Sequence, residues 1–294
     1  MYILENEFLT VEISLKGAEI KRIFDKNIGK ERLWNGNPDF WGRTSPVLFP
    51  IVGKVASNKY FINGKEYSLP QHGFARDENF TVTEQTDSMI WFELLSSEKT
   101  LTSYPFAFSL RIGYELSHSS VTVKWEVVNN GSSFMPFSIG AHPAFLTNLF
   151  DEDELSDSYL HLEKKDKIET YIFDNDSGLV RDEKEVIMPD LKLLPLSKDL
   201  FEEYPTLILE DETALTLKSY HHDHGVRLGF ADFPYVGIWS PINALGEAAP
   251  FVCIEPWFGM ADTSDVPGEL SQKKGIQLLD AKEKFSTSYR MDFY

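Results

Sequence analysis

Residues 110–127 read LRIGYELSHSSVTVKWEV. Apolar side chains take every second position on each side of the polar residues 117–120, at Leu110, Ile112, Tyr114 and Leu116 and again at Val121, Val123, Trp125 and Val127. In a β-strand, such alternation places the apolar side chains on one face and the polar side chains on the other. The stretch therefore predicts two strands of an antiparallel sheet with one buried face.

The same alternation returns elsewhere in the chain, most clearly at 9–16 and more briefly at 160–162, 215–217 and 226–230. Asn63-Gly64 lies between two short strand-like runs, a pattern typical of a tight hairpin. Helical periodicity is confined to 197–204 and 264–274, each long enough for a turn or two. Many short strands with few short helices predict an all-β fold, a large antiparallel sandwich or barrel. Because no Gly/Ser-rich or Pro-rich linker interrupts the chain, residues 1–294 are expected to form a single domain.

Composition narrows the class of partner. The 294 residues include 46 acidic and 28 basic side chains, which give a formal net charge of −18. This charge repels nucleic-acid phosphates and anionic lipids, so neither nucleic acid nor a membrane is an expected partner. No apolar run approaches the roughly 18 residues that span a bilayer.

The single cysteine, Cys253, leaves no disulfide to form within the chain. The N-terminal segment has no basic stretch followed by an apolar one, the pattern of a secretory leader. We therefore expect a cytoplasmic protein, with a monomer and a homodimer both left open.

Two histidines lie beside small residues. In Gln71-His72-Gly73-Phe74-Ala75-Arg76, an imidazole and a guanidinium can reach one small ligand, or His72 can be an incidental residue of a surface turn. In Gly140-Ala141-His142-Pro143, the proline forces His142 into an extended conformation and so fixes its direction. A functional histidine and a hydrogen-bonded structural histidine are equally open for this second segment.

A single carboxylate lies in the apolar run Phe251-Val252-Cys253-Ile254-Glu255-Pro256-Trp257. Strand alternation puts Cys253 and Glu255 on the same face. Partial desolvation of Glu255 would raise the pKa of its carboxyl group and make it a better base. The alternatives are a buried ion pair and a strand end exposed to solvent.

Two polar segments have the composition of metal sites without the spacing. Adjacent residues of His221-His222-Asp223-His224 diverge, so a loop is expected there. Asp174-Asn175-Asp176-Ser177-Gly178 resembles the start of a calcium loop, but Gly178 stands where a ligand is needed and Leu179 replaces the turn glycine. We expect no metal ion.

Four motifs occur in order along the chain: WGRTSPVLFPIVGK at 41–54, QHGFAR at 71–76, GAHPAF at 140–145 and CIEPW at 253–257. Together they resemble the aldose 1-epimerase (galactose mutarotase) family, and its LacX-like branch in particular. The resemblance covers nearly the whole chain. It implies a galactose mutarotase-like β-supersandwich that binds a small-molecule sugar in an open groove, a role in carbohydrate metabolism, and no cofactor.

The resemblance also implies roles for particular residues. His142 would be the general acid toward the ring oxygen, Glu255 the general base toward the anomeric hydroxyl, and His72 a second active-site histidine that hydrogen-bonds the sugar. The family has an aspartate that binds sugar hydroxyls, for which Asp232 is the candidate here. Further sugar contacts are expected from two cationic and three aromatic side chains, namely Lys54, Arg76, Phe74, Trp239 and Trp257.

The predicted activity is the interconversion of the α and β anomers of a free hexose such as galactose or glucose. An acid and a base that act together predict a bell-shaped pH dependence, with the carboxylate on the acid limb and the imidazole on the alkaline limb. One alternative is a hexose-6-phosphate 1-epimerase, which needs a cationic cluster such as Lys54, Arg76 and Arg43. Another is a non-catalytic sugar-binding protein. A glycosidase needs two carboxylates that flank the bond, and only Glu255 is evident.

Overall fold

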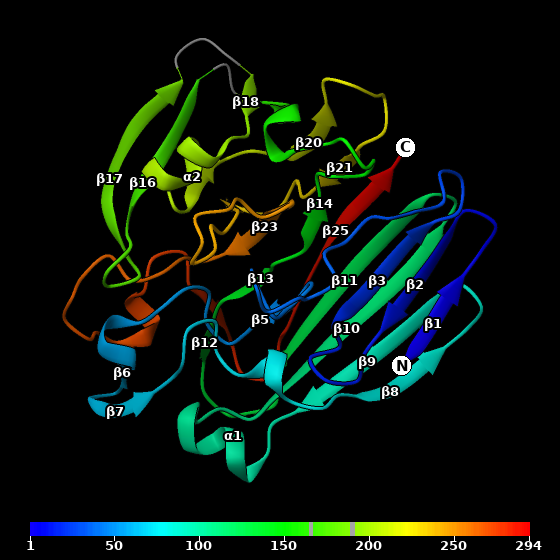
Figure 1. The fold of residues 1–294 in the computed structure, drawn as a ribbon. Coiled ribbons are helices and arrows are strands. Elements are labelled where there is room, and N and C mark those ends of the chain that lie inside the picture. The colour runs from blue at the N-terminus through cyan, green and yellow to red at the C-terminus, as the bar shows by residue number, and fades with distance from the viewer. Residues whose placement is uncertain (165–166, 189–191) are drawn as a thin grey trace.

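Three antiparallel sheets and three two-stranded hairpins or ribbons form the fold (Figure 1). The computed structural model describes residues 1–164, 167–188 and 192–294. Within these ranges, the largest sheet has nine strands in the order β18 (Leu193–Pro195), β15 (Ser158–Leu162), β20 (Ala214–Ser219), β21 (Val226–Gly229), β25 (Lys284–Phe293), β11 (Ser120–Asn129), β10 (Phe108–Ser117), β9 (Met89–Leu95) and β8 (Thr81–Gln85).

The other sheets are smaller. A six-stranded sheet has the order β19 (Leu207–Glu210), β22 (Tyr235–Trp239), β23 (Phe251–Phe258), β13 (Ile139–Ala141) and β5 (Val47–Leu48), with β14 (Ala144–Leu146) also paired to β23. A four-stranded sheet consists of β1 (Tyr2–Glu5), β2 (Leu9–Ile13), β3 (Ile20–Asp25) and β4 (Lys30–Glu31). The two-stranded units are β6 (Lys59–Ile62) with β7 (Lys65–Ser68), β12 (Met135–Phe137) with β24 (Gln277–Leu279), and β16 (Ile168–Asp174) with β17 (Leu179–Met188).

Helices are short in the described ranges. The α-helices are α1 (Glu98–Ser103) and α2 (Lys198–Glu203), and the 3-10 turns are η1 (Ala56–Asn58), η2 (Ala75–Asp77), η3 (Leu155–Asp157) and η4 (Leu270–Gln272). α2 and η4 lie in the two stretches predicted to hold helical turns. α1 was not predicted, because a capping box between Ser97 and Thr100, rather than apolar periodicity, marks its start. None of these described helices is long and apolar enough to cross a membrane.

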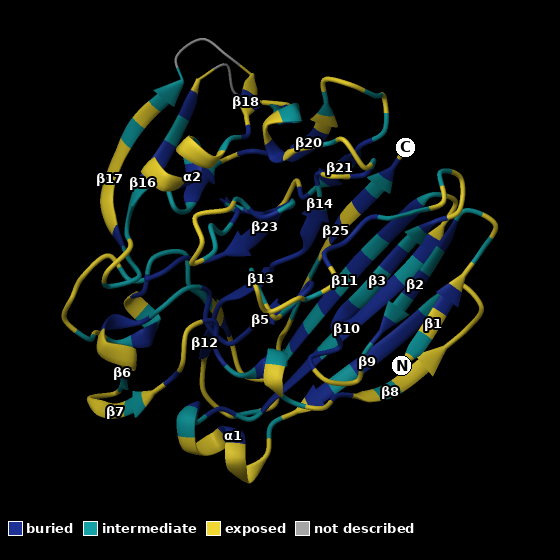
Figure 2. Ribbon diagram, viewed as in Figure 1, coloured by how far each residue is buried: buried dark blue, intermediate teal, exposed yellow. Residues whose placement is uncertain are grey.

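The predicted all-β fold class is confirmed, and the alternation that predicted it agrees with burial. In β11, Val121, Val123, Trp125 and Val127 are buried while the residues between them are only partly covered. The Asn63-Gly64 hairpin is also confirmed, with Ile62 paired to Lys65. Apolar side chains from the nine-, six- and four-stranded sheets form one core cluster. Figure 2 shows buried residues along most strands of these sheets and exposed residues mainly in loops and edge strands such as β8.

β23 is the strand that organises the candidate site. Each of its eight residues is buried, because β22 pairs with one edge and β13 and β14 pair in succession with the other. Gly140 of β13 pairs with Trp257, and Ala144 of β14 pairs with Cys253. The register is the same on both sides of the break between β13 and β14, so the intervening His142 falls opposite Glu255.

Candidate active site

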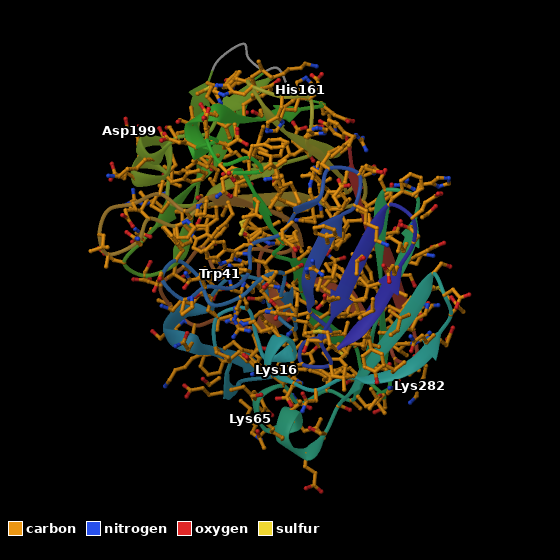
Figure 3. The ribbon with its side chains drawn as sticks, turned by 45° about the vertical axis from the view of Figure 1, so that its right-hand side comes forward. Lys16, Trp41, Lys65, His161, Asp199 and Lys282 are labelled. Carbon is orange, nitrogen blue, oxygen red and sulfur yellow. The ribbon has the colours of Figure 1, made fainter. Side chains whose placement is uncertain are left out.

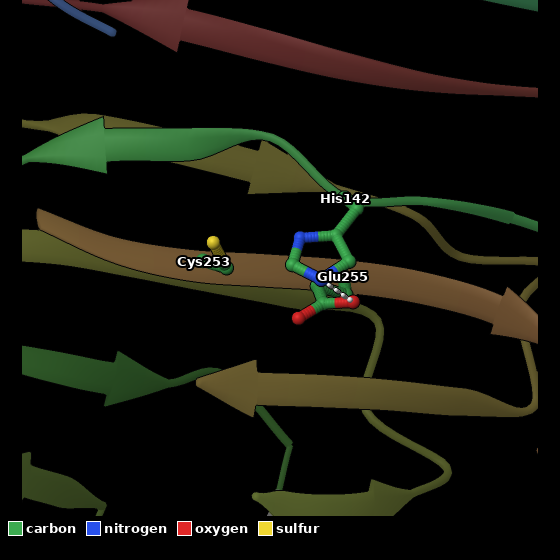
Figure 4. A group of neighbouring side chains, drawn as sticks. All are labelled: His142, Cys253 and Glu255. Carbon is green, nitrogen blue, oxygen red and sulfur yellow. Dashed lines mark ion pairs between the residues drawn. The ribbon is translucent and has the colours of Figure 1, made fainter. Parts of the chain in front are cut away.

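His142 and Glu255 are brought together by this register. The distance from His142 Nε2 to Glu255 Oε2 is 3.3 Å (Figure 4). Both residues are buried, and Glu255 is only 1% exposed. The structure therefore places one imidazole and one carboxylate side by side, out of bulk water, as the sequence motifs predicted.

Two tryptophans hold the His142 ring. Trp41 stacks on it, with ring centroids 4.5 Å apart and planes inclined by 25°. Trp239 contacts it edge-on at 5.5 Å. Figure 3 shows Trp41 on the face of the molecule that also carries Lys16. Because the ring is confined between aromatic side chains, its Nε2 stays directed at Glu255.

His72 lies beside this pair, with its ring centroid 5.7 Å from that of His142. The backbone N–H of Gly53 donates to His72 Nδ1 at 3.1 Å, so the neutral ring carries its hydrogen on Nε2. The turn that presents His72 needs Gly73, which has φ of +68° and whose added Cβ would meet the Phe49 carbonyl oxygen at 2.3 Å. His72 is thereby fixed as a hydrogen-bond donor through Nε2.

Burial sets the protonation of these groups. It raises the pKa of Glu255 well above its ordinary value. It lowers the pKa of His142 to about 3, with the charge of Arg76 acting in the same direction. It also lowers the pKa of His72, with further contributions from His142 and Arg76. These shifts favour a protonated carboxyl group beside neutral imidazoles, so His142 and Glu255 together hold one proton.

A cavity of about 410 Å³ opens onto the pair. This volume is in the range of small-molecule sites, which is about 300–1,000 Å³. Seven of the nine residues predicted from the sequence line it: Lys54, His72, Arg76, His142, Trp239, Glu255 and Trp257. The structure thus brings four separate sequence motifs to one cavity.

The two predicted cations are engaged within the protein. Lys54 Nζ donates to the Ser177 carbonyl oxygen at 2.7 Å. Arg76 donates from Nη2 to the Gln71 carbonyl oxygen at 2.6 Å, and burial lowers the pKa of its guanidinium to about 10. Both side chains therefore border the cavity, but each already donates a hydrogen bond to a backbone carbonyl group of the protein.

The structure does not bring Phe74 and Asp232 to this cavity. Phe74 packs into the core, with its ring centroid 6.1 Å from that of Phe108. Asp232 lies between β21 and β22 and lines a separate hollow together with Arg227 and Arg290. The sequence could not show the position of either residue, because strand alternation and motif order do not determine which way a loop side chain turns.

Sequence reasoning missed several residues that line the cavity. Trp41 and Gln71 were part of quoted motifs but were given no role. Asn175, Asp176 and Ser177 form the turn between β16 and β17, where the sequence was examined only as a failed calcium loop. A polar turn between two strands was a visible signal, but nothing local showed that the hairpin folds over this cavity.

One group of described residues has the composition of a metal site. Ligand atoms of His142, Cys253 and Glu255 all lie within 4.8 Å of one another (Figure 4). A soft divalent cation would suit this donor set, but it needs the thiolate, and burial raises the pKa of the Cys253 thiol well above its ordinary value. The arrangement is therefore better suited to proton transfer between His142 and Glu255.

The other histidine-rich segment, 221–224, is a loop, as expected. It packs against the acidic segment 151–157, with His222 Nε2 3.3 Å from Asp153 and His221 Nε2 3.5 Å from Asp157. Neither histidine lines the main cavity.

The fold and the site together define a mutarotase-like β protein with a histidine and a carboxylate buried side by side. The family model for aldose 1-epimerase matches residues 1–277, and the chain belongs to this family. Plasmid-encoded LacX of Lactococcus lactis subsp. lactis is 30% identical over 281 residues, which cover 93% of this chain and 92% of that protein. The chromosomal LacX is 30% identical over 284 residues with the same coverage.

Solved structures agree with this assignment. A galactose mutarotase related enzyme from Lactobacillus acidophilus is 33% identical and has a TM-score of 0.93, with 100% of this chain and 97% of that chain covered. A galactose mutarotase-like protein from Lactobacillus casei is 32% identical and has a TM-score of 0.92, with both chains fully covered.

Proposed function

We propose that the protein is an aldose 1-epimerase that interconverts the α and β anomers of a free hexose such as galactose or glucose. The observation that carries this proposal is the buried contact of 3.3 Å between His142 Nε2 and Glu255 Oε2 at the cavity. Anomerisation needs one group that removes the proton of the O1 hydroxyl and one that protonates the ring oxygen. The site supplies one of each.

In the proposed reaction, the proton of the pair first resides on Glu255 and passes to His142 across the short contact. Carboxylate and imidazolium are then in place, and hydroxyl groups of the sugar that donate to Glu255 stabilise the carboxylate. Glu255 takes the O1 proton while His142 gives its proton to the ring oxygen. The bond from C1 to the ring oxygen breaks, and C1 and O1 form the aldehyde.

Rotation about the C1–C2 bond then presents the other face of the aldehyde. The reverse transfers close the ring as the opposite anomer and return the proton to His142. His72 donates from Nε2 to a sugar oxygen near the reacting atoms. Trp239 and Trp257 offer faces for the C–H groups of the sugar. Only protons move between the sugar and the protein in this scheme, so the proposed reaction requires no cofactor.

One observation favours a second candidate, a hexose-6-phosphate 1-epimerase. Trp41 and Arg76 also line a neighbouring hollow of about 480 Å³, together with Lys16, Lys21 and Arg43. Asp77 lies between three of these cations, 3.0 Å from Arg43, 3.9 Å from Arg76 and 4.0 Å from Lys16. Glu19 also lines this hollow, 3.3 Å from Lys21, so a phosphate group would need Asp77 displaced and would bind mainly to Arg43, Arg76 and Lys16.

Proton NMR of freshly dissolved α-glucose and α-galactose in low buffer tests the proposed activity. The wild-type protein should speed the approach to anomeric equilibrium. His142→Asn and Glu255→Gln should each lower kcat by about 100-fold or more. A folded variant with near wild-type rate would overturn the assignment of the pair. Sugar binding without any acceleration would support a non-catalytic sugar-binding protein instead.

We further propose that residues 1–294 work as one domain in the cytoplasm, as a monomer or a homodimer. An apolar core that includes both Leu4 and Phe293 supports the single domain. The buried free thiol of Cys253 supports a reducing compartment.

A further inference from the structure

The turn between β16 and β17 forms one wall of the cavity and is folded by its own first aspartate. Asp174 Oδ1 accepts the backbone N–H of Asp176 at 3.0 Å and that of Ser177 at 3.4 Å. Gly178 completes the turn with φ of +72°, and its N–H donates to the Asp174 carbonyl oxygen at 2.8 Å. The Asp174 side chain is thus occupied in shaping the turn.

Lys54 attaches this turn to the part of the chain that carries the acid–base site. Its Nζ donates to the Ser177 carbonyl oxygen at 2.7 Å. A Cβ added to Gly178 would lie 3.2 Å from Lys54 Cδ, so the stem of the lysine also packs against the turn. Lys54 directly follows Gly53, which exchanges hydrogen bonds with His72 through its N–H and its carbonyl oxygen. One lysine therefore links the position of the turn to that of His72.

Asp176 differs from Asp174 in having no internal task. It is exposed and lines the cavity beside Asn175. In the described ranges 1–164, 167–188 and 192–294, no hydrogen bond or ion pair involves its side chain. Asp176 and Glu255 are the two described carboxylates that line the cavity, one at the surface and one at the buried pair. A surface carboxylate of this kind is an acceptor for hydroxyl groups.

We infer that the β16–β17 turn is a hydroxyl-binding subsite, in which Asp176 accepts hydrogen bonds from sugar hydroxyls remote from C1 and Lys54 acts as a positioning residue. The inference rests on the proposed function, since it assumes that a sugar occupies the cavity with C1 at His142 and Glu255. It also replaces direct sugar binding as the role of Lys54. The ligand class is a neutral sugar with free hydroxyl groups.

Sugar affinity and turnover measured together test this subsite. Trp41, Trp239 and Trp257 line the cavity, so their fluorescence can report binding of galactose and glucose. Asp176→Asn should weaken binding and raise KM by about tenfold, because the acceptor loses its charge and one of its two acceptor oxygens. Its kcat should change by less than about twofold, because no contact to the reacting atoms is altered. Asp87→Asn is the matched control, because Asp87 is an exposed aspartate in the turn between β8 and β9, outside the cavity, and its variant should leave both values unchanged.

A double-mutant cycle separates positioning from direct contact. Lys54→Met should weaken binding, Lys54→Arg should restore it through its retained donors, and Lys54→Met with Asp176→Asn should be no weaker than the worse single variant. Additive effects would mean that Lys54 binds the sugar independently, and unchanged affinity in Asp176→Asn would overturn the subsite.

Deoxy sugars extend the same test to individual hydroxyls. Among the 3-, 4- and 6-deoxy hexoses, at least one should bind to Asp176→Asn and to the wild type equally, because it lacks the hydroxyl group that donates to Asp176. A loss of equal size with every deoxy sugar would contradict the inferred contact. If the wild-type protein binds sugar without anomerising it, the proposed function fails while the affinity measurements still decide the subsite.

Discussion

At the scale of single residues, His142 and Glu255 pair a lowered pKa with a raised one. Ionisation would give His142 a positive charge and Glu255 a negative charge. Burial disfavours both charged forms. The pair therefore holds one proton, with His142 Nε2 and Glu255 Oε2 3.3 Å apart. This description reverses the order of titration that the sequence predicts from ordinary pKa values.

The pH dependence of kcat/KM should follow the reversed order. Activity requires that His142 and Glu255 together hold one proton. It falls on the acid side when His142 is protonated while Glu255 is also protonated, and on the alkaline side when Glu255 loses its proton and leaves the pair with none. Because the pKa of His142 is lowered to about 3, activity should persist below pH 5. Rates measured from the acid side upward check this. An acid limb near the ordinary histidine pKa of about 6.5 would contradict it.

Glu255→Gln should stabilise the protein while it removes activity. The pKa of Glu255 is raised above its ordinary value of 4.5, so this carboxyl group stabilises the fold below pH 4.5 and loses that contribution as pH rises toward the raised value. Glutamine has no such cost. The variant should therefore have a higher free energy of unfolding than the wild type at neutral pH.

Urea unfolding of both proteins at pH 4 and pH 7.5 gives the comparison, with Asp232→Asn as an exposed control. The advantage of the glutamine variant should grow with pH. If the difference in free energy of unfolding between the variant and the wild type were the same at both pH values, the pKa of Glu255 would not be raised.

At the scale of elements, the turn that carries His72 depends on close contact between two chain segments. Gly73 and Gly64 both have positive φ, +68° and +75°. An added Cβ at Gly73 would meet the Phe49 carbonyl oxygen at 2.3 Å, whereas nothing lies within 4 Å at Gly64. Comparing alanine substitutions at the two glycines therefore separates the free energy of left-handed backbone strain from that of a steric clash with Phe49.

Gly73→Ala should lower the free energy of unfolding clearly more than Gly64→Ala. The second substitution carries only the left-handed strain, about 1–2 kcal/mol. The first adds displacement of the 49–50 backbone, so it should also raise KM through His72. Chemical denaturation and steady-state kinetics on the two variants check this. Equal losses in both would mean that the segment around Phe49 yields without cost.

Sequence patterns predicted elements better than their partners. Alternation gave the strands and buried faces of β2, β10 and β11, and Asn63-Gly64 gave a hairpin, because both signals are local. The pairing of β11 with β25 joins residues about 160 positions apart, for which no local signal exists. The same limit explains the site. The sequence motifs identified His142, Glu255 and His72 as site residues. The position of the β16–β17 hairpin at the cavity, and of Asp232 away from it, depends on tertiary packing.

At the scale of the whole molecule, the charge of −18 and the local cations act in opposite directions on an anionic substrate. At physiological ionic strength the Debye length is about 8 Å, so most of the net charge is screened from a ligand in the cavity. The cations nearest to the cavity therefore determine how well an anionic substrate binds. Arg43 is already paired with Asp77 and Lys54 with the Ser177 carbonyl group.

We therefore expect free hexoses to be converted with kcat/KM about tenfold or more above that of their 6-phosphates, because a phosphate would have to displace Asp77 from its ion pairs. NMR exchange at matched ionic strength measures both. Asp77→Asn should narrow the gap by freeing Arg43. A preference of the wild type for glucose 6-phosphate or galactose 6-phosphate would favour the second candidate function instead.

In the proposed function, reaction chemistry and sugar preference belong to parts of the backbone that can vary separately. His142 and Glu255 face each other because an unbroken register runs from β13 through β14 along β23, deep in a six-stranded sheet. The 175–177 turn belongs to a hairpin outside that sheet. Mutations in the turn can therefore accumulate without moving the acid and the base. In evolution or in a randomised library, we therefore expect substitutions in this turn to change the preferred sugar while the buried pair stays in place.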